Sequence, residues 1–336
     1  MTGAFHLIAL GLAACAALAL AVNAQDAAKP AEPPARAQIQ RDKTPGRQVR
    51  VAAIPIGMGG DYDKKVKLAL SHLETAGSQG VDIACLPEEF AGTNAEPIPG
   101  PTTNAVAEVA KKHNMWVVCP IRELADKEQF NTAVLLDRQG KVAGFYRKVF
   151  VFWGEGANVS RDGVKVFDTD FGRISLLTCF DLNYAELWLD AEKQGTELLL
   201  WPSAYGGGTP LNGNAMIHGY YIVAVGWGNI IDCTGETIKD VEKPREQQFI
   251  ATLDLDRTFV HKDFTGEKIK KLLKEHKGEV EMEKDCAMEG WYLLRSVKAG
   301  VLVRDLCKQY QIETLRDYRH RSREQINEAR KEGRKI

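Results

Sequence analysis

Strands alternate with helices in each of two successive halves between residues 49 and 254, and this repeated alternation constrains the fold of the chain more than any other feature. Each short apolar run that is typical of a buried strand is followed by a segment with apolar residues at helical spacing. The predicted strand and helix pairs lie at residues 49–56 and 62–76, 81–86 and 103–113, 173–178 and 183–194, and 197–201 and 212–219. Strands that alternate with helices indicate an α/β protein whose sheets are covered by helices. The two-part scheme predicts two sheets packed face to face.

A hairpin interrupts this alternation and makes the first sheet mixed. Predicted strands at residues 130–137 and 141–146 flank a short turn that contains Gly140. A short loop with glycine between two such runs favours an antiparallel hairpin.

The first 24 residues have the features of a secretory signal peptide. An apolar run at residues 7–22 is followed by a small residue at each side of Asn23, with Ala24 as the last residue removed. We therefore expect a secreted or periplasmic protein. Two alternatives stay open: the leader remains as an uncleaved anchor, or Leu12-Ala13-Ala14-Cys15 acts as a lipoprotein box and Cys15 is lipidated. Contact with a membrane is expected only in these two cases.

Composition divides the remaining chain into a linker, a folded domain and an extension. Residues 25–48 are rich in Ala, Pro and charged residues, a composition that predicts a flexible linker. Residues 49–256 are predicted to form the folded domain. Residues 257–336 are predicted to form a charged helical C-terminal extension. The net charge of −1 argues against a general nucleic-acid binder, and the basic final stretch is interpreted as an exposed helix. The cysteines show no metal-binding spacing. Cys286 and Cys307 could pair in an oxidising compartment.

Cys179 is the candidate nucleophile. It lies between a predicted buried strand and a predicted helix, where a helix N-terminus would lower the pKa of a thiol. The alternative is a small apolar residue at the end of a strand. The usual base, histidine, is not found beside it, because the seven histidines lie mostly in predicted helices or in the charged extension. Glu88 and Lys148 instead follow two earlier predicted strands.

Three motifs in this order resemble the Glu-Lys-Cys triad of the nitrilase superfamily, the carbon–nitrogen hydrolases. They are Pro87-Glu88, Tyr146-Arg147-Lys148 and Cys179-Phe180-Asp181, each directly after a predicted strand. Glu155 and Trp201-Pro202-Ser203-Ala204-Tyr205 resemble further family motifs. The resemblance covers about residues 49–256 and implies a four-layer αββα sandwich with two mixed sheets.

The resemblance also implies a role for each residue. Glu88 would accept the proton of Cys179, whose thiolate attacks an amide carbonyl to form a thioester. Lys148 and the backbone N–H of Phe180 would stabilise the oxyanion. Glu155 would orient Lys148 or the substrate. No metal and no organic cofactor is implied.

The expected substrate is a small linear amide or carbamoyl amide. Asp181, two places after the cysteine, is similar to the amidase branches of the family, whereas true nitrilases have glutamate there. Trp153 and Tyr205 are candidates for lining the pocket. A true nitrilase, an N-acyltransferase that uses the same thioester, and a non-catalytic binding protein that retains the fold are the alternatives. The resemblance further predicts a homo-oligomer.

Overall fold

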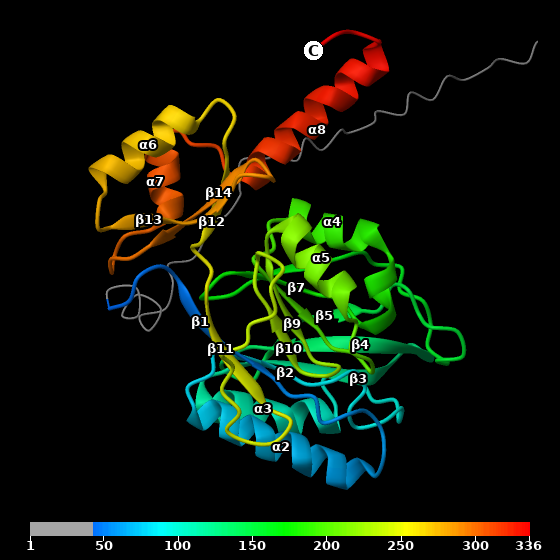
Figure 1. Ribbon diagram of the computed structural model, residues 1–336. Coiled ribbons are helices and arrows are strands. Elements are labelled where there is room, and N and C mark those ends of the chain that lie inside the picture. Colours follow the sequence, from blue (N-terminus) through cyan, green and yellow to red (C-terminus); the bar gives the residue numbers. More distant parts are fainter. Residues whose placement is uncertain (1–42) are drawn as a thin grey trace, which may run out of the picture.

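The computed structural model of the protein describes residues 43–336 (Figure 1). The predicted signal peptide, Cys15 and most of the predicted linker, residues 25–42, lie outside the described residues. Within residues 43–336, no helix combines the length and the apolar character needed to cross a bilayer.

The first sheet is mixed and has six strands in the order β11-β1-β2-β3-β4-β5. Its strands are β1 (Gln48–Ala53), β2 (Ile83–Cys85), β3 (Trp116–Ala125), β4 (Glu128–Leu136), β5 (Val142–Arg147) and β11 (Phe249–Asp254). The pairs β1·β2 and β2·β3 are parallel, whereas β11 and the predicted hairpin β4·β5 pair antiparallel to their neighbours. Consequently β2, β3 and β5 run in the same direction, and their C-terminal ends lie at one edge of the sheet.

The second sheet is also mixed and has five strands in the order β10-β9-β8-β7-β6. Its strands are β6 (Val166–Asp168), β7 (Arg173–Leu176), β8 (Leu198–Trp201), β9 (Tyr221–Ala224) and β10 (Asn229–Ile231). The three central strands are parallel and, apart from the exposed Arg173 at the start of β7, buried, which explains their largely apolar sequences.

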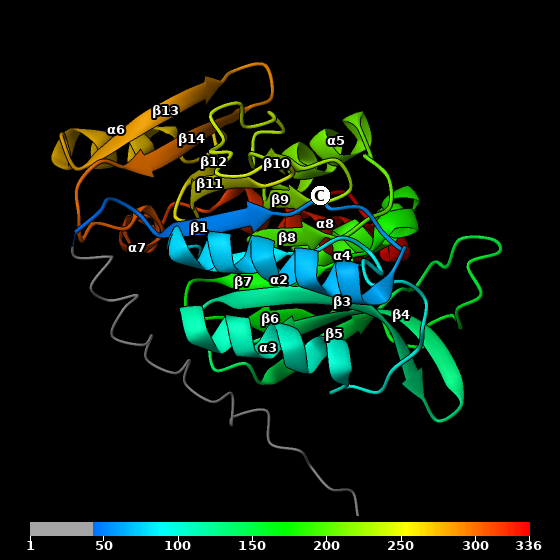
Figure 2. The same cartoon turned by 90° about the horizontal axis from the view of Figure 1, so that it is seen from below.

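Strand alternation places the core on both faces of the first sheet. In β1, Val51 and Ala53 share a cluster with apolar residues of the second sheet, whereas Ala52 faces the other way and packs with the helices α2 (Tyr62–Ser78) and α3 (Pro101–His113). The helices α4 (Ala185–Lys193) and α5 (Thr209–His218) cover the second sheet (Figures 1 and 2). The predicted four-layer αββα sandwich is confirmed.

The C-terminal extension contains helices and, in addition, a three-stranded antiparallel sheet. The helices are α6 (Gly266–Glu275), α7 (Val303–Gln309) and α8 (Leu315–Glu332), and the strands β12 (Thr258–His261), β13 (Val280–Cys286) and β14 (Trp291–Ser296) pair in the order β12-β14-β13. This sheet corrects the sequence-based description of the extension as helical. Sequence reasoning missed it because β13, VEMEKDC, is mostly charged and half-exposed, so that it lacks an apolar pattern.

The cysteines of the extension are not bonded to each other. Cys286 ends β13 and Cys307 lies in α7, and all six described cysteines have free thiols. The disulfide that the sequence left open is therefore absent from the described structure.

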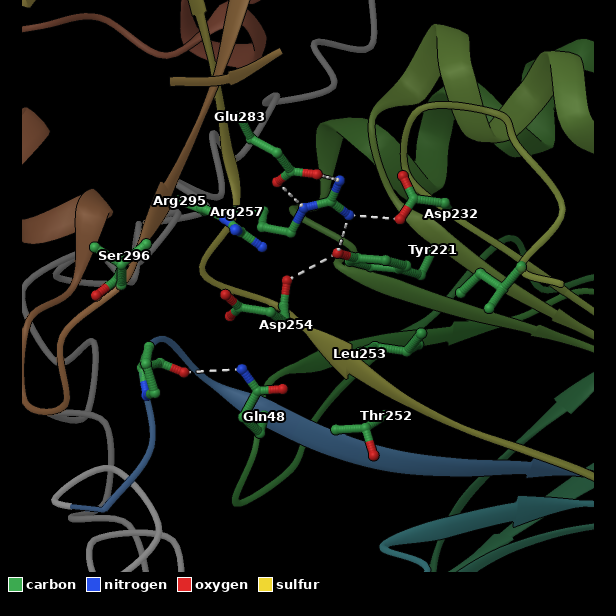
Figure 3. Close-up of a pocket in the computed structure, with 13 residues that line it drawn as sticks. Gln48, Tyr221, Asp232, Thr252, Leu253, Asp254, Arg257, Glu283, Arg295 and Ser296 are labelled. Carbon is green, nitrogen blue, oxygen red and sulfur yellow. Dashed lines mark hydrogen bonds and ion pairs between the residues drawn. The ribbon is translucent and has the colours of Figure 1, made fainter. Parts of the chain in front are cut away.

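Arg257 joins the extension to the sandwich (Figure 3). Its guanidinium donates to both carboxylate oxygens of Glu283 in β13, at 2.7 and 2.6 Å, and also contacts Asp232 and the Tyr221 hydroxyl of the sandwich. These residues line an open cavity of about 530 Å³. Since Arg257 has a carboxylate on each side, the charge in this cavity is already paired.

Two further contacts fix the start of the sandwich and the start of α7. Arg47, in the segment predicted as linker, forms an ion pair with Glu197, so close packing begins before Val49. The buried carboxylate of Asp256 accepts hydrogen bonds from the backbone N–H groups of Val303 and Arg304, where α7 begins.

Candidate active site

Three strand ends deliver the three predicted catalytic residues to one place. Glu88 follows β2, Lys148 directly follows β5, and both strands end at the same edge of the first sheet. Cys179 follows β7 in the second sheet, which packs face to face on the first. The sandwich therefore brings together residues that are 60 and 31 positions apart, as the sequence predicted.

Lys148 lies between two carboxylates. Its Nζ atom is 2.8 Å from Oε1 of Glu88 and 2.6 Å from Oε2 of Glu155, and its side chain is only 1% exposed. Burial opposes the charged form, but Glu88, Cys179 and Glu155 together raise the pKa of Lys148 above its usual range. Lys148 is thus a fixed cation. Glu155 contacts Lys148 directly, and its role in orienting the lysine or the substrate stays a prediction.

Glu88 is held by neutral donors as well as by Lys148. The side-chain amide of Asn131 in β4 donates hydrogen bonds to Oε1 of Glu88, at 2.8 Å, and to Oε1 of Glu155, at 2.6 Å. The backbone N–H of Ala204 donates a hydrogen bond of 2.9 Å to Oε2 of Glu88. Sequence reasoning missed Asn131. An asparagine within an otherwise apolar strand was the available indication, because asparagine is uncommon in strands.

Glu155 is also supported by an arginine that the sequence did not indicate. The buried Arg122 of β3 pairs with Glu89 and donates hydrogen bonds of 3.1 and 3.0 Å to the backbone carbonyls of Glu155 and Gly156. The Glu89–Arg122 pair therefore fixes the loop that carries Glu155. Glu89, the residue after Glu88, has this structural role.

Cys179 begins a single 3₁₀ turn, Cys179–Asn183, that precedes α4. Its N–H donates 3.0 Å to the Pro202 carbonyl, and its carbonyl accepts from the Trp201 indole at 3.2 Å. The backbone of Cys179 is left-handed, with φ of +48°, a conformation that costs a non-glycine residue about 1–3 kcal/mol. Two hydrogen bonds to the second sheet hold the cysteine in this conformation.

The environment of Cys179 raises the pKa of its thiol to about 12. Burial is the largest cause, followed by the negative charge of Glu88, while Lys148 and Ser203 act in the opposite direction. This corrects the expectation of a lowered pKa at a helix N-terminus, because the turn is short and Glu88 lies closer. The sulfur of Cys179 is therefore protonated at neutral pH.

We expect the alkylation of Cys179 by iodoacetamide to accelerate about tenfold per pH unit from about pH 6 to about pH 9, without a plateau. Replacing Glu88 with Gln removes the negative charge that raises the thiol pKa, so alkylation at a given pH should become faster. Peptide-level mass spectrometry measures the rate at Cys179 alone. A plateau near neutral pH would contradict the high pKa.

Asp181 connects the 3₁₀ turn that begins at Cys179 to the segment that follows Lys148. Its buried carboxylate accepts hydrogen bonds from the Tyr146 hydroxyl at 2.8 Å, the Phe150 N–H at 2.8 Å and the Thr178 N–H at 2.9 Å. Burial raises the pKa of Asp181 to about 6, against these three donors. Asp181 is thus a positioning residue.

Tyr146→Phe is expected to lower the free energy of unfolding by about 1–3 kcal/mol, because it leaves the buried Asp181 carboxylate without one of its donors. Urea unfolding monitored by circular dichroism measures this change. Tyr318→Phe, which alters a half-buried tyrosine in α8, is the matched control. Equal stability of the Tyr146 variant and the wild type would show that the hydroxyl does not support Asp181.

Two further residues predicted by the resemblance lie beside the site. Phe180 is the second residue of the 3₁₀ turn, and its ring packs edge-on against Phe152 at 5.3 Å between centroids. Tyr205 lies close enough to Cys179 for the two charges to interact and packs edge-on against Trp201. Trp153 differs, because its side chain is 88% exposed on the loop that precedes Glu155. The structure therefore places Tyr205 at the site and Trp153 at the outer surface.

Among the described residues 43–336, no group of three or more His, Cys, Asp or Glu side chains is arranged to hold a metal ion. The chemistry that this site offers comes from a thiol, two carboxylates, a buried ammonium group and backbone N–H groups.

A family model described as "Carbon-nitrogen hydrolase" matches residues 49–259. Among curated proteins, human omega-amidase NIT2 is 29% identical over 175 residues, which cover 46% of this chain and 63% of that protein. Beta-ureidopropionase of Arabidopsis thaliana is 32% identical over 157 residues, covering 39% and 38%. N-carbamoylputrescine amidase of Solanum lycopersicum is 28% identical over 179 residues, covering 48% and 60%. The chain thus spans less than two thirds of the length of these relatives.

Solved structures share the fold. Nit3 of Saccharomyces cerevisiae, described as a member of branch 10 of the nitrilase superfamily, matches with a TM-score of 0.55 at 19% identity, covering 62% of this chain and 91% of that one. An amidase from Nesterenkonia sp. matches with a TM-score of 0.54 at 19% identity, covering 67% and 97%. At these identities the likeness supports the sandwich alone.

Proposed function

Because this chain belongs to the carbon–nitrogen hydrolase family of the nitrilase superfamily, we propose that it hydrolyses the C–N bond of a small linear amide or carbamoyl amide through a thioester on Cys179. The observation that carries the proposal is the position of Lys148 between Glu88 and Glu155, at 2.8 and 2.6 Å, beside a buried cysteine.

In the first half of the reaction, the Cys179 sulfur attacks the carbonyl carbon while Glu88 takes the thiol proton. The carbonyl oxygen becomes an oxyanion, which the Lys148 ammonium and the Phe180 N–H stabilise. The C–N bond then breaks, and Glu88 returns the proton to the departing ammonia or amine. An acyl thioester on Cys179 remains.

In the second half, water attacks the thioester carbonyl and Glu88 accepts its proton. The S–C bond breaks, the acid leaves, and the proton returns to the sulfur. Since the thiol pKa is about 12, proton transfer to Glu88 must accompany the attack, and the carboxylate and the sulfur must therefore act together. The fixed position of Glu88 meets this requirement.

A small substrate fits the surroundings of the nucleophile. Cys179 is 9% exposed, and this burial favours a small substrate over a bulky one. The Asp181 side chain is occupied by three donors, and it stands where true nitrilases have glutamate. The matched relatives that are named as amidases support the same preference for amides.

The test is a panel of linear amides, carbamoyl amino acids and nitriles, assayed for ammonia and for the carboxylic acid product. We expect release of ammonia or amine together with free acid from at least one amide or carbamoyl compound, and a mass increase on Cys179 in acid-quenched samples. Transfer of the acyl group to an added amine, without free acid, would show an acyltransferase instead. Turnover of nitriles alone would overturn the amide proposal.

A further inference from the structure

A second cavity, of about 380 Å³, lies where the C-terminal extension meets the end of the sandwich formed by α4 and α5. Figure 1 shows α8 leaving the small sheet of the extension above these two helices. Five arginines line the cavity from both sides: Arg173 of β7, Arg257 between β11 and β12, Arg304 of α7, and Arg316 and Arg319 of α8. The acids in its lining are Glu192 and Asp317.

The carboxylates near this cavity already have other hydrogen-bond or ion-pair partners. Glu192 is hydrogen-bonded to His218 and lies 3.4 Å from His320, and the exposed Asp317 accepts a hydrogen bond from Thr314. Glu197, at the edge of the cluster, is shared by two arginines: burial opposes its ionisation, but Arg304 and Arg47 hold the pKa of Glu197 at about 2. Glu192 and Glu197 are thus shared among several partners, whereas Asp317 is exposed and bonded to Thr314.

Arg316 and Arg319 are the arginines without a partner carboxylate. Among the ion pairs of the described chain, neither residue takes part in one; Arg316 donates to the backbone carbonyls of Thr196 and His218 at 2.7 and 3.3 Å, and Arg319 donates to that of Ile217. Burial and the nearby charge of Arg304 lower the pKa of Arg316, and burial lowers that of Arg319. When burial and like charges lower the pKa of a cation, a nearby anion stabilises its charged form.

We propose that this cavity, which we term the arginine cavity, binds a small phosphate-bearing anion, such as a phosphate monoester or a diphosphate. Guanidinium groups bind phosphate oxygens with paired N–H donors, and several of them converge here from two parts of the chain. The volume lies at the lower end of the range for small-molecule sites. The cavity around Arg257 offers no such site, because its arginine is already held between Glu283 and Asp232.

A ligand in the arginine cavity would connect the extension to the sandwich. Arg173 belongs to the second sheet, whereas Arg304 and Arg316 belong to the extension, so an anion between them replaces repulsion among cations with shared contacts. A ligand that binds only the folded state raises the apparent stability with the logarithm of its concentration once that concentration exceeds the Kd. The site lies apart from Cys179 and does not depend on the proposed amide hydrolysis.

The test is isothermal titration calorimetry of the full-length protein with inorganic pyrophosphate, with sodium chloride at matched ionic strength as the reference. We expect saturable binding to the wild type and at least about tenfold weaker binding to Arg316→Gln. Arg330→Gln, which removes the same charge from the exposed end of α8, is the matched control and should bind as the wild type does.

A second variant and a second readout keep the test informative if Arg316→Gln folds poorly. Arg319→Gln removes a half-buried arginine of the same cavity and should also weaken binding. In thermal unfolding, pyrophosphate should raise the Tm of the wild type and of Arg330→Gln but not that of the two cavity variants. Absence of binding to the wild type, or equal binding to all four proteins, would overturn the proposal.

Discussion

Cys179→Ala is expected to lower the rate of amide hydrolysis by roughly a millionfold, to the level of the uncatalysed reaction. The reason is that the remaining groups, Glu88, Lys148 and Glu155, stabilise a transition state that forms only when a nucleophile attacks. Lys148 pairs with both glutamates whether or not the sulfur is present, so the site should stay assembled. Ammonia release with a saturating amide measures the effect.

The control for this variant is Cys286→Ala, because Cys286 is a half-exposed cysteine at the end of β13, far along the chain from the site. Its turnover should equal that of the wild type. The Cys179 variant should also lose the acyl adduct in acid-quenched samples. Undiminished turnover after Cys179→Ala would refute the thioester mechanism.

Lys148→Met is expected to reduce kcat by about 100- to 1,000-fold and to lower the free energy of unfolding by about 3–5 kcal/mol. The catalytic loss follows from removing the cation that faces the oxyanion. The loss of stability follows because Glu88 and Glu155 would remain as two nearby carboxylates without the buried cation between them. The same change removes a charge that lowers the Cys179 pKa, so the alkylation of the thiol should also become slower.

Lys165→Met is the matched control, since Lys165 is a partly exposed lysine that pairs with Asp162 at the surface. We expect a change in its unfolding free energy of under about 1 kcal/mol and no change in kcat. Urea unfolding and steady-state kinetics at one pH separate the two effects. A Lys148 variant that is unstable but retains its kcat would show that the lysine has only a structural role.

The sequence was sufficient to predict the sandwich and the proximity of Glu88, Lys148 and Cys179, because each of these depends on a local pattern. Glu88, Lys148 and Cys179 follow apolar runs that are typical of strands, and parallel strands place their C-terminal ends together. The position of Glu155 beside Lys148 also follows from their closeness in the chain. The signal peptide, the homo-oligomer and the secreted or periplasmic location stay predictions.

The contacts that could not be predicted are those between residues far apart in the chain. Asn131 acts on Glu88 across 43 positions, and Arg122 acts on Glu89 across 33. Glu197 meets Arg304 across 107 positions, so the charge of the arginine cavity cannot be counted from the sequence. The sheet of the extension also depends on a distant pairing, of β12 with β14, and no local pattern indicates it.

The left-handed backbone of Cys179 bears on the idea that this chain is a binding protein that kept only the fold. Glycine adopts a φ of +48° freely, so a glycine at this position would relieve the strain. A lineage selected only for a stable scaffold would gain by that exchange, since most proteins have little stability to spare. We infer that a cysteine is kept in this strained conformation because its sulfur is used. The strain at position 179 therefore favours an enzyme over a binding protein.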